Sequence, residues 1–156
     1  MRHRNLPLLL LQARENVIGR FRPILGAHGL TEQQWRIIRA LLEEEKTDAT
    51  GAGGGLEPHQ ISSLCRISSP SLAGVLARMD SLGLVQRERM PEDQRRVRVS
   101  LTPKSLDLAA AMAPEIEATY AQIEDQVGAE LLQRAYATLD ELVGLLGQAE
   151  GGSDGE

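Results

Sequence analysis

Basic side chains gather in one short stretch of this chain, between Arg87 and Arg98. Residues 66–104 carry 8 basic and 4 acidic side chains, a formal charge of +4, whereas residues 105–156 carry 1 basic and 11 acidic ones, a charge of −10. The whole chain has a formal charge of −5, so the distribution of charge says more than its sum. Clustered guanidinium groups suit the phosphates of nucleic acids. Charge alone does not distinguish this function from a solvated basic surface, so the surrounding motifs must decide.

The arginines lie in two segments that predict the strands of a β-hairpin. Residues 84–89 and 96–101 are the predicted strands, and the sequence MPEDQR joins them. Alternate residues of a strand point to opposite faces, which places Val97, Val99 and Leu101 on one face and Arg96, Arg98 and Ser100 on the other. The hairpin therefore has one basic face.

The tip of this hairpin carries Arg95 and Arg96, which can enter a narrow, electronegative minor groove of DNA. Asp93, two residues earlier, can hold the Arg95 guanidinium by a charge-assisted hydrogen bond. We predict phosphate contacts for Arg87, Arg89 and Arg98.

Two short helices, over residues 57–66 and 69–82, precede the hairpin and are joined by a tight turn. This is the helix-turn-helix pattern, whose second helix enters the major groove. Ser69 is the predicted N-cap of that helix and Pro70 lies in its first turn. With Leu72, Leu76 and Met79 facing inward, the positions predicted to face DNA are Ser69, Pro70, Ser71, Gly74 and Arg78, beside Ala73 and Ala77. Most are small, so DNA shape should carry much of the specificity.

Longer apolar-striped helices flank this module. Residues 6–28 show helical spacing with a break expected at Pro23, and a capping box of Thr31 and Gln34 begins a helix that continues through Leu42. Residues 46–55 are a predicted flexible linker, and residues 147–156 a disordered tail. Helices follow over 103–146, the first of them capped by Thr102 and bent at Pro114.

The predicted fold is mainly α with one β-hairpin. It is a single domain over residues 1–146, in which a winged helix-turn-helix (57–101) lies between two sets of dimerisation helices (6–28 and 103–146). The flanking stripes are too apolar for the surface of an isolated monomer, so we expect a homodimer and a pseudo-palindromic operator in double-stranded DNA.

The segment DQRRVRVSLTPKS, residues 93–105, resembles the wing signature of the MarR (multiple antibiotic resistance regulator) family. That signature has Asp, any residue, Arg, then a strand ending in Leu-Thr and a helix start. Ser105 stands where the family often has Gly, which we expect to alter the start of that helix. The order of elements resembles the family from about Leu6 to Leu146, and the resemblance favours Arg95 as the residue inserted into the minor groove.

Residues 9–41 are similar to members of this family that repress operons for the breakdown of aromatic acids. The resemblance implies a repressor that a small aromatic carboxylic acid, such as a hydroxyphenylacetate, releases from DNA. Such a ligand needs a cation and an apolar slot. The candidates are Arg14 for the carboxylate, Val17, Ile18, Phe21 and Trp35 for the ring, and Gln34 or His28 for a phenolic hydroxyl. Alternatively, Arg14 pairs with an acidic neighbour such as Glu15.

Other functions have weaker support in the sequence. Cys65, the one cysteine, would make an oxidation sensor if exposed. Its place with Ile61 and Leu64 on the apolar side of the helix over residues 57–66 predicts a buried structural thiol instead. An acidic helical interaction protein without DNA binding is a second alternative. The three histidines are scattered, so we expect no metal site. The sequence shows no nucleophile paired with a general base, so we expect no enzyme. It also has no cofactor-binding motif. The apolar run near the start is too short for a membrane span, so we expect a cytoplasmic protein.

Overall fold

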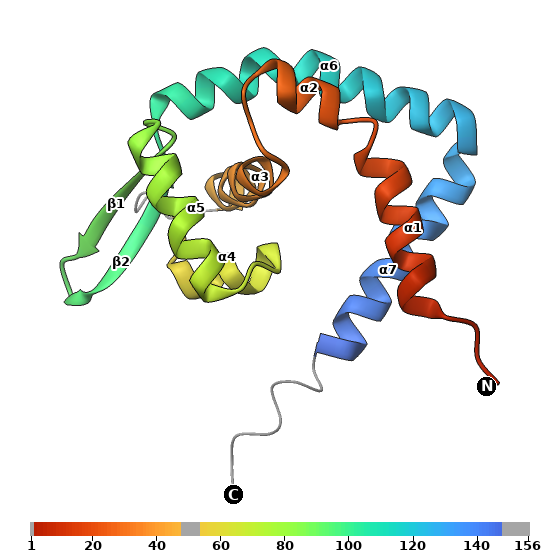
Figure 1. The fold of residues 1–156 in the computed structure, drawn as a ribbon, viewed down its shortest axis with the longest axis horizontal. Helices are drawn as coiled ribbons and strands as arrows, with labels where there is room; N and C mark the ends of the chain where they lie inside the picture. The colour runs from red at the N-terminus through yellow and green to blue at the C-terminus, as the bar shows by residue number, and fades with distance from the viewer. Residues whose placement is uncertain (1, 48–53, 148–156) are drawn as a thin grey trace, which may run out of the picture. The chain divides into compact units, whose positions relative to one another are not determined.

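The structure is a computed structural model that describes residues 2–47 and 54–147 (Figure 1). Its helices and strands are α1 (Leu6–Ile18), α2 (Arg22–Ala27), α3 (Glu32–Thr47), α4 (Pro58–Cys65), α5 (Ser69–Ser81), β1 (Val85–Met90), β2 (Asp93–Leu101), α6 (Pro103–Val127) and α7 (Ala129–Gly147). The predicted class, mainly helical with one antiparallel hairpin, is confirmed. The described residues form two compact units, one ending at Glu115 and one beginning at Ile116.

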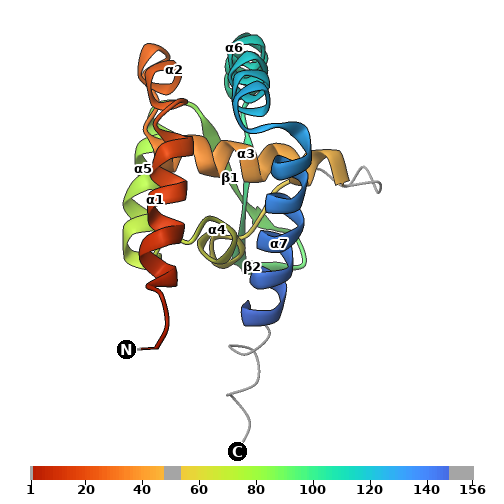
Figure 2. The same cartoon turned by 90° about the vertical axis from the view of Figure 1, so that its right-hand side faces the viewer.

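Helix α3 is the centre of the first unit. It packs against α2, α4, α5 and β2, and its Ile37, Ile38 and Leu41 are at most 1% exposed. Figure 1 shows α3 nearly end-on beside α4 and α5, and Figure 2 shows it along its length. The DNA-binding module predicted from the sequence therefore shares its core with the helix that precedes it.

The predicted break in the first helical segment is confirmed. Helix α1 ends at Ile18, and Pro23 lies in the first turn of α2, where its missing N–H costs nothing. The capping box before α3 is also confirmed, because the Thr31 amide donates to Gln34 Oε1 (3.0 Å) and the Gln34 amide to Thr31 Oγ1 (3.2 Å).

The boundary of the predicted linker needs a correction. Lys46 and Thr47 belong to α3, because the run Glu43–Lys46 consists of good helix formers and Lys46 lies at the favourable, negative end of the helix dipole. Residues 48–53 of the predicted linker, and residues 148–156 of the predicted tail, lie outside the described residues. Gly54 and Gly55 lead into α4.

The helix-turn-helix is formed by α4 and α5, with two local corrections. Ser68, not Ser69, is the N-cap of α5, since Ser68 has an extended backbone (φ −61°, ψ 147°) and Ser69 is already helical. Leu64, predicted on the apolar side of α4, is 65% exposed, whereas Ile61 and Cys65 are buried. The buried side of this short helix is therefore narrower than the sequence suggested.

The hairpin is longer than predicted and its turn is tighter. Strand β2 begins at Asp93, three residues before the predicted start, and pairs with β1 from Val85↔Leu101 to Met90↔Asp93, with an irregular register between Arg89 and Met90. The polar residues of MPEDQR concealed this extension, because outward-facing positions at the end of a hairpin need no apolar side chain. Gln94 Nε2 also donates to the Met90 carbonyl (3.2 Å).

Helix α6 begins as predicted, with Thr102 Oγ1 accepting from the Ser105 amide (3.3 Å). Ser105 itself is fully buried, and its hydroxyl donates to the Leu84 carbonyl at the base of the hairpin. The residue that departs from the family pattern thus ties α6 to the residue just before β1. Pro114 lies inside α6, one residue before the last of the first unit; a bend there stays a prediction. The second unit holds the rest of α6 and α7, joined at Gly128.

Candidate nucleic-acid interface and ligand site

The outer face of α5 is exposed. Leu72, Leu76 and Met79 are at most 2% exposed and hold the opposite face in the core. A Cβ atom added at Gly74 would meet nothing within 4 Å, so this side is open. All the positions predicted to face DNA lie on the exposed part of the helix: Ser69, Pro70, Ser71, Gly74 and Arg78.

Arg95 stands out on the hairpin, with a side chain that is 93% exposed. Asp93 Oδ1 accepts hydrogen bonds from the Arg95 amide (3.0 Å) and from Arg95 Nε (3.3 Å). The predicted contact between these two residues is present in the structure. It fixes the base of the guanidinium and leaves the terminal nitrogens facing solvent, as insertion into a groove requires.

The arginines predicted to contact phosphates have partners within the protein. Arg87 Nη2 and Nε donate to Asp80 Oδ2 (2.8 and 3.3 Å), which joins β1 to α5. Arg89 Nη1 donates to the Gln94 carbonyl across the hairpin (2.5 Å). Arg98 is half-buried next to Gly55. Phosphate contact by these side chains stays a prediction.

Arg96 differs from its neighbour Arg95. Its Nε and Nη2 donate to the two carboxylate oxygens of Glu57 (2.9 and 2.7 Å). These hydrogen bonds hold the pKa of the Glu57 carboxyl below its usual range and raise the pKa of Arg96. The sequence placed both arginines at the tip as candidates for the minor groove, whereas the structure shows Arg96 bound to the residue that precedes α4.

Arg14, the predicted carboxylate anchor, lies in a cluster of ion pairs. Arg14 donates to Glu15 (3.1 Å) and to Glu32, Arg22 contacts the same two carboxylates (2.8 and 3.3 Å), and Arg36 contacts Glu32 (3.1 Å). The alternative in which Arg14 pairs with an acidic neighbour is thus the one seen in the structure. Three guanidinium groups face two carboxylates, so the cluster keeps an excess of one positive charge.

The other predicted ligand residues lie in varied surroundings. Phe21 is buried in the core at 5% exposure, and Val17 is 45% exposed. Ile18 and Trp35 are half-buried. Two residues predicted to bind a phenol have partners: Gln34 Oε1 serves the capping box, and His28 Nε2 lies 3.7 Å from Glu115 Oε1. A shared cavity for this set stays a prediction.

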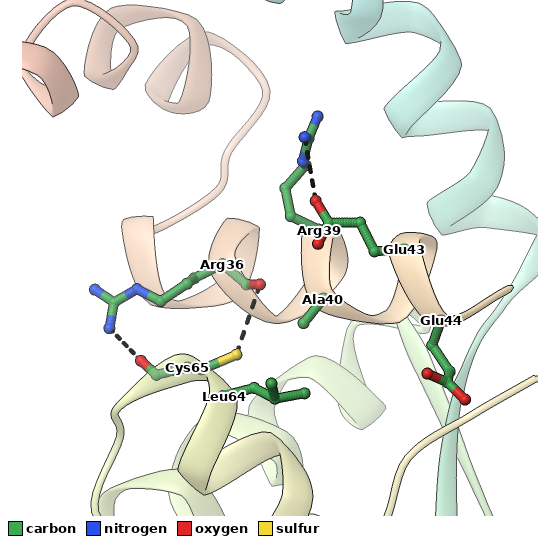
Figure 3. A pocket seen from close by; sticks show the side chains of 7 residues that line it. All are labelled: Arg36, Arg39, Ala40, Glu43, Glu44, Leu64 and Cys65. Atoms are coloured by element: carbon green, nitrogen blue, oxygen red, sulfur yellow. Dashed lines mark hydrogen bonds and ion pairs between the residues drawn. The ribbon is translucent and has the colours of Figure 1, made fainter. Parts of the chain in front are cut away.

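A pocket of about 410 Å³ opens between α3 and α4, lined by Arg36, Arg39, Ala40, Glu43, Glu44, Leu64 and Cys65 (Figure 3). Arg36 Nη1 donates to the Cys65 carbonyl (2.7 Å), and the Cys65 thiol donates to the Arg36 carbonyl (3.7 Å). Sequence reasoning missed this pocket, although Arg36, Arg39, Ala40 and Glu43 recur at helical spacing.

Cys65 is 2% exposed, and burial raises the pKa of its thiol. The prediction of a buried cysteine is confirmed.

Comparison with known proteins decides the family. The model of the MarR family matches residues 28–96. The homoprotocatechuate degradative operon repressor of Escherichia coli is 41% identical over 143 residues, which cover 92% of this chain and 90% of that protein. The chain belongs to the MarR family.

Solved structures agree with this membership. The crystal structure of transcriptional regulator PA4135 has a TM-score of 0.81 at 41% identity and covers 90% of this chain and 96% of that one. The crystal structure of NadR in complex with 4-hydroxyphenylacetate has a TM-score of 0.77 at 35% identity, covering 91% and 94%. The MarR family is dimeric.

Within 2–47 and 54–147, no group of three or more His, Cys, Asp or Glu residues is placed to hold a metal ion. None of the helices in those ranges combines the length and the apolar character that crossing a membrane requires.

Proposed function

We propose that this MarR-family chain is a ligand-responsive repressor of an operon for aromatic-acid breakdown. It binds a pseudo-palindromic operator as a homodimer and leaves it when a small aromatic carboxylic acid binds. The relative that is 41% identical over nearly the whole chain represses the homoprotocatechuate operon. A repressor works where DNA is, so the proposed location is the cytoplasm.

The arrangement of α5 and Arg95 is the observation that supports DNA binding. The exposed face of α5 offers small side chains, which allow the backbone close to the major groove, and Arg95 is held by Asp93 at the end of the hairpin. Arg87, Arg89 and Arg98 supply phosphate contacts in this proposal. A guanidinium has five N–H donors. Arg87 gives two of them to Asp80, so it can still donate to a phosphate.

The homodimer is supported by two helices that bury none of their residues in the single chain. Within α1, Leu8 and Leu11 are 47% and 52% exposed; within α7, Val143 and Leu146 are 65% and 66% exposed. Water-exposed apolar side chains in such numbers mark an interface. A second copy covers them in our proposal and places two copies of α5 for two half-sites.

The inducer site is proposed around Arg14. NadR, a relative in structure and sequence, has been crystallised with 4-hydroxyphenylacetate. A carboxylate of that kind would compete with Glu32 and Glu15 for the Arg14 guanidinium, and the spare positive charge of the cluster favours it. Val17, Ile18, Phe21 and Trp35 would contact the ring, and Gln34 or His28 the phenolic hydroxyl.

The test uses the full-length protein and a duplex from the region upstream of its own gene, with a scrambled duplex of equal length as control. We expect preference for the native duplex, a loss of about three powers of ten or more in affinity between 50 and 200 mM salt, and release by 4-hydroxyphenylacetate. Equal affinity for both duplexes would contradict the repressor. Operator binding that no aromatic acid reverses at millimolar concentration would contradict the inducer class alone.

A further inference from the structure

The hairpin is fastened to the start of α4 by the residues just before that helix. Leu56 pairs with Val99 of β2 through two backbone hydrogen bonds, Leu56 N to Val99 O (2.9 Å) and Val99 N to Leu56 O (2.8 Å). Leu56 is 5% exposed. An isolated two-stranded hairpin is marginally stable. The Leu56–Val99 bridge adds a short third partner at the base of the wing, which is the hairpin of β1 and β2.

Gly55 allows the chain to come this close. Its φ is +145°, in the region that favours glycine. A Cβ atom on Gly55 would lie 2.7 Å from both the Val99 carbonyl oxygen and Arg98 Cγ. A side chain at this position would therefore push the segment off the strand.

Glu57 extends the same contact toward the tip. Its carboxylate accepts from Arg96, three residues nearer to the turn than Val99. Glu57 is itself held, because its amide donates to Gln60 Oε1 in the first turn of α4 (2.8 Å). The Glu57 side chain is only 15% exposed, against 50% for Arg96. Glu57 is therefore the fixed member of the pair, next to the helix-turn-helix, and it supports Arg96 on the hairpin.

We propose that Glu57 and Arg96 form a positioning pair that sets the wing against the helix-turn-helix, so that Arg95 reaches the minor groove while Arg96 makes no DNA contact. Arg95 and Arg96 are adjacent on a strand and so point to opposite faces. Asp93 holds Arg95 at Nε and leaves its terminal nitrogens exposed, whereas Arg96 donates to both carboxylate oxygens of Glu57. This inference rests on the proposed function.

Whether Glu57 and Arg96 position the wing can be tested by the direction in which Glu57→Gln changes affinity for the operator. Glu57→Gln removes a negative charge from a surface that approaches DNA, so electrostatics alone would tighten binding. A misplaced wing would weaken it. Glu92→Gln is the matched control, since Glu92 is an exposed acid at the hairpin turn and its loss changes the charge by the same amount.

Affinity for the operator duplex is measured by fluorescence anisotropy, with thermal unfolding recorded for each variant. We expect Glu57→Gln to bind about tenfold more weakly or worse, and Glu92→Gln to bind as tightly as wild type or more tightly. Arg96→Gln should also weaken binding, and by more than Glu57→Gln, because it removes a positive charge as well as the pair. The double variant should lie between the two single variants, because both changes break one interaction and their charge effects cancel.

Arg96→Lys supplies a second test on an exposed strand, where folding is not at risk. Lysine keeps the charge that a phosphate contact needs but loses the two-point geometry that Glu57 requires, so our inference expects weakened binding. Glu57→Gln binding as tightly as Glu92→Gln, or Arg96→Lys binding like wild type, would overturn the positioning pair. Failure of wild type and Glu92→Gln to prefer the operator would instead overturn the proposed function.

Discussion

The arginines of the hairpin show how one side-chain type takes several tasks. Asp80 and the Gln94 carbonyl hold Arg87 and Arg89, Glu57 holds Arg96, and Arg95 alone is 93% exposed. A guanidinium is always charged and has five N–H donors, and those of Arg95 are more exposed than those of Arg87 or Arg96, so they are more available to a ligand. The exposed one is therefore the first to test at the level of single residues.

Arg95→Ala should weaken operator binding by about tenfold or more and lower the slope of affinity against salt concentration. It should change the free energy of unfolding by less than about 0.5 kcal/mol, because its side chain lies outside the core. Fluorescence anisotropy at several salt concentrations and urea denaturation measure the two quantities. Arg95→Ala binding with wild-type affinity would remove the wing tip from the mechanism.

Cys65 should behave as a structural residue. Because burial raises the pKa of its thiol, the folded protein should react with iodoacetamide far more slowly at pH 8 than the urea-unfolded protein. The raised pKa also means that the folded state holds the thiol proton more tightly than the unfolded state does. The free energy of unfolding should therefore fall as pH rises past the thiol pKa of the unfolded chain. In Cys65→Ala this fall should be smaller.

A matching functional test treats wild type with peroxide. Operator binding should persist, as it should in untreated Cys65→Ser. Release of DNA from peroxide-treated wild type, but not from treated Cys65→Ser, would favour the oxidation sensor instead.

Which contacts could be foreseen depends on their distance along the chain. Asp93 and Arg95 are two residues apart, and their spacing on a strand sufficed to predict the contact. Glu57 and Arg96 are 39 residues apart, and only the folded approach of Gly55 to β2 brings them together. Arg14 shows the same limit, because Glu15 was foreseeable as a partner whereas Glu32 lies on another helix.

At the level of elements, local chemistry determined most of what could be predicted. Pro23 and the box of Thr31 and Gln34 act within four residues, so the break before α2 and the start of α3 follow from the sequence. Strand β2 was predicted too short, since Asp93 and Gln94 are polar and only the cross-strand pairing of Met90 with Asp93 reveals that the strand begins there.

The cap of α3 should matter because this helix carries the shared core. Thr31→Ala removes the side-chain oxygen that accepts from the Gln34 amide, and should cost about 1 kcal/mol in the free energy of unfolding. Thr31→Ser keeps that oxygen and should cost much less. Urea denaturation measures both, and equal stability of Thr31→Ala and wild type would show that the cap contributes nothing to the fold.

At the level of the whole molecule, relief of repression requires that ligand binding at one site of the protein alter DNA binding at another. A chain of contacts runs from α1 to the helix-turn-helix within the first unit. Arg14 of α1 binds Glu32, Arg36 binds the same carboxylate, and Arg36 also donates to the carbonyl of Cys65 at the end of α4. A ligand whose carboxylate binds Arg14 would act on this chain at its first member.

Arg14→Ala should therefore lose induction while keeping operator affinity. A ligand shifts the protein between DNA-binding forms only by its different affinity for the two, and removing the partner of its carboxylate removes that difference. We expect at least tenfold more 4-hydroxyphenylacetate to be needed for half-release of the operator, roughly the loss that one charge-assisted hydrogen bond entails.

Arg22→Ala is the matched control, since Arg22 contacts the same Glu15 and Glu32 and carries the same charge. If both variants lose induction equally, the charge of the cluster draws the ligand and neither arginine anchors it; if Arg14→Ala releases DNA at the wild-type concentration, the carboxylate binds elsewhere.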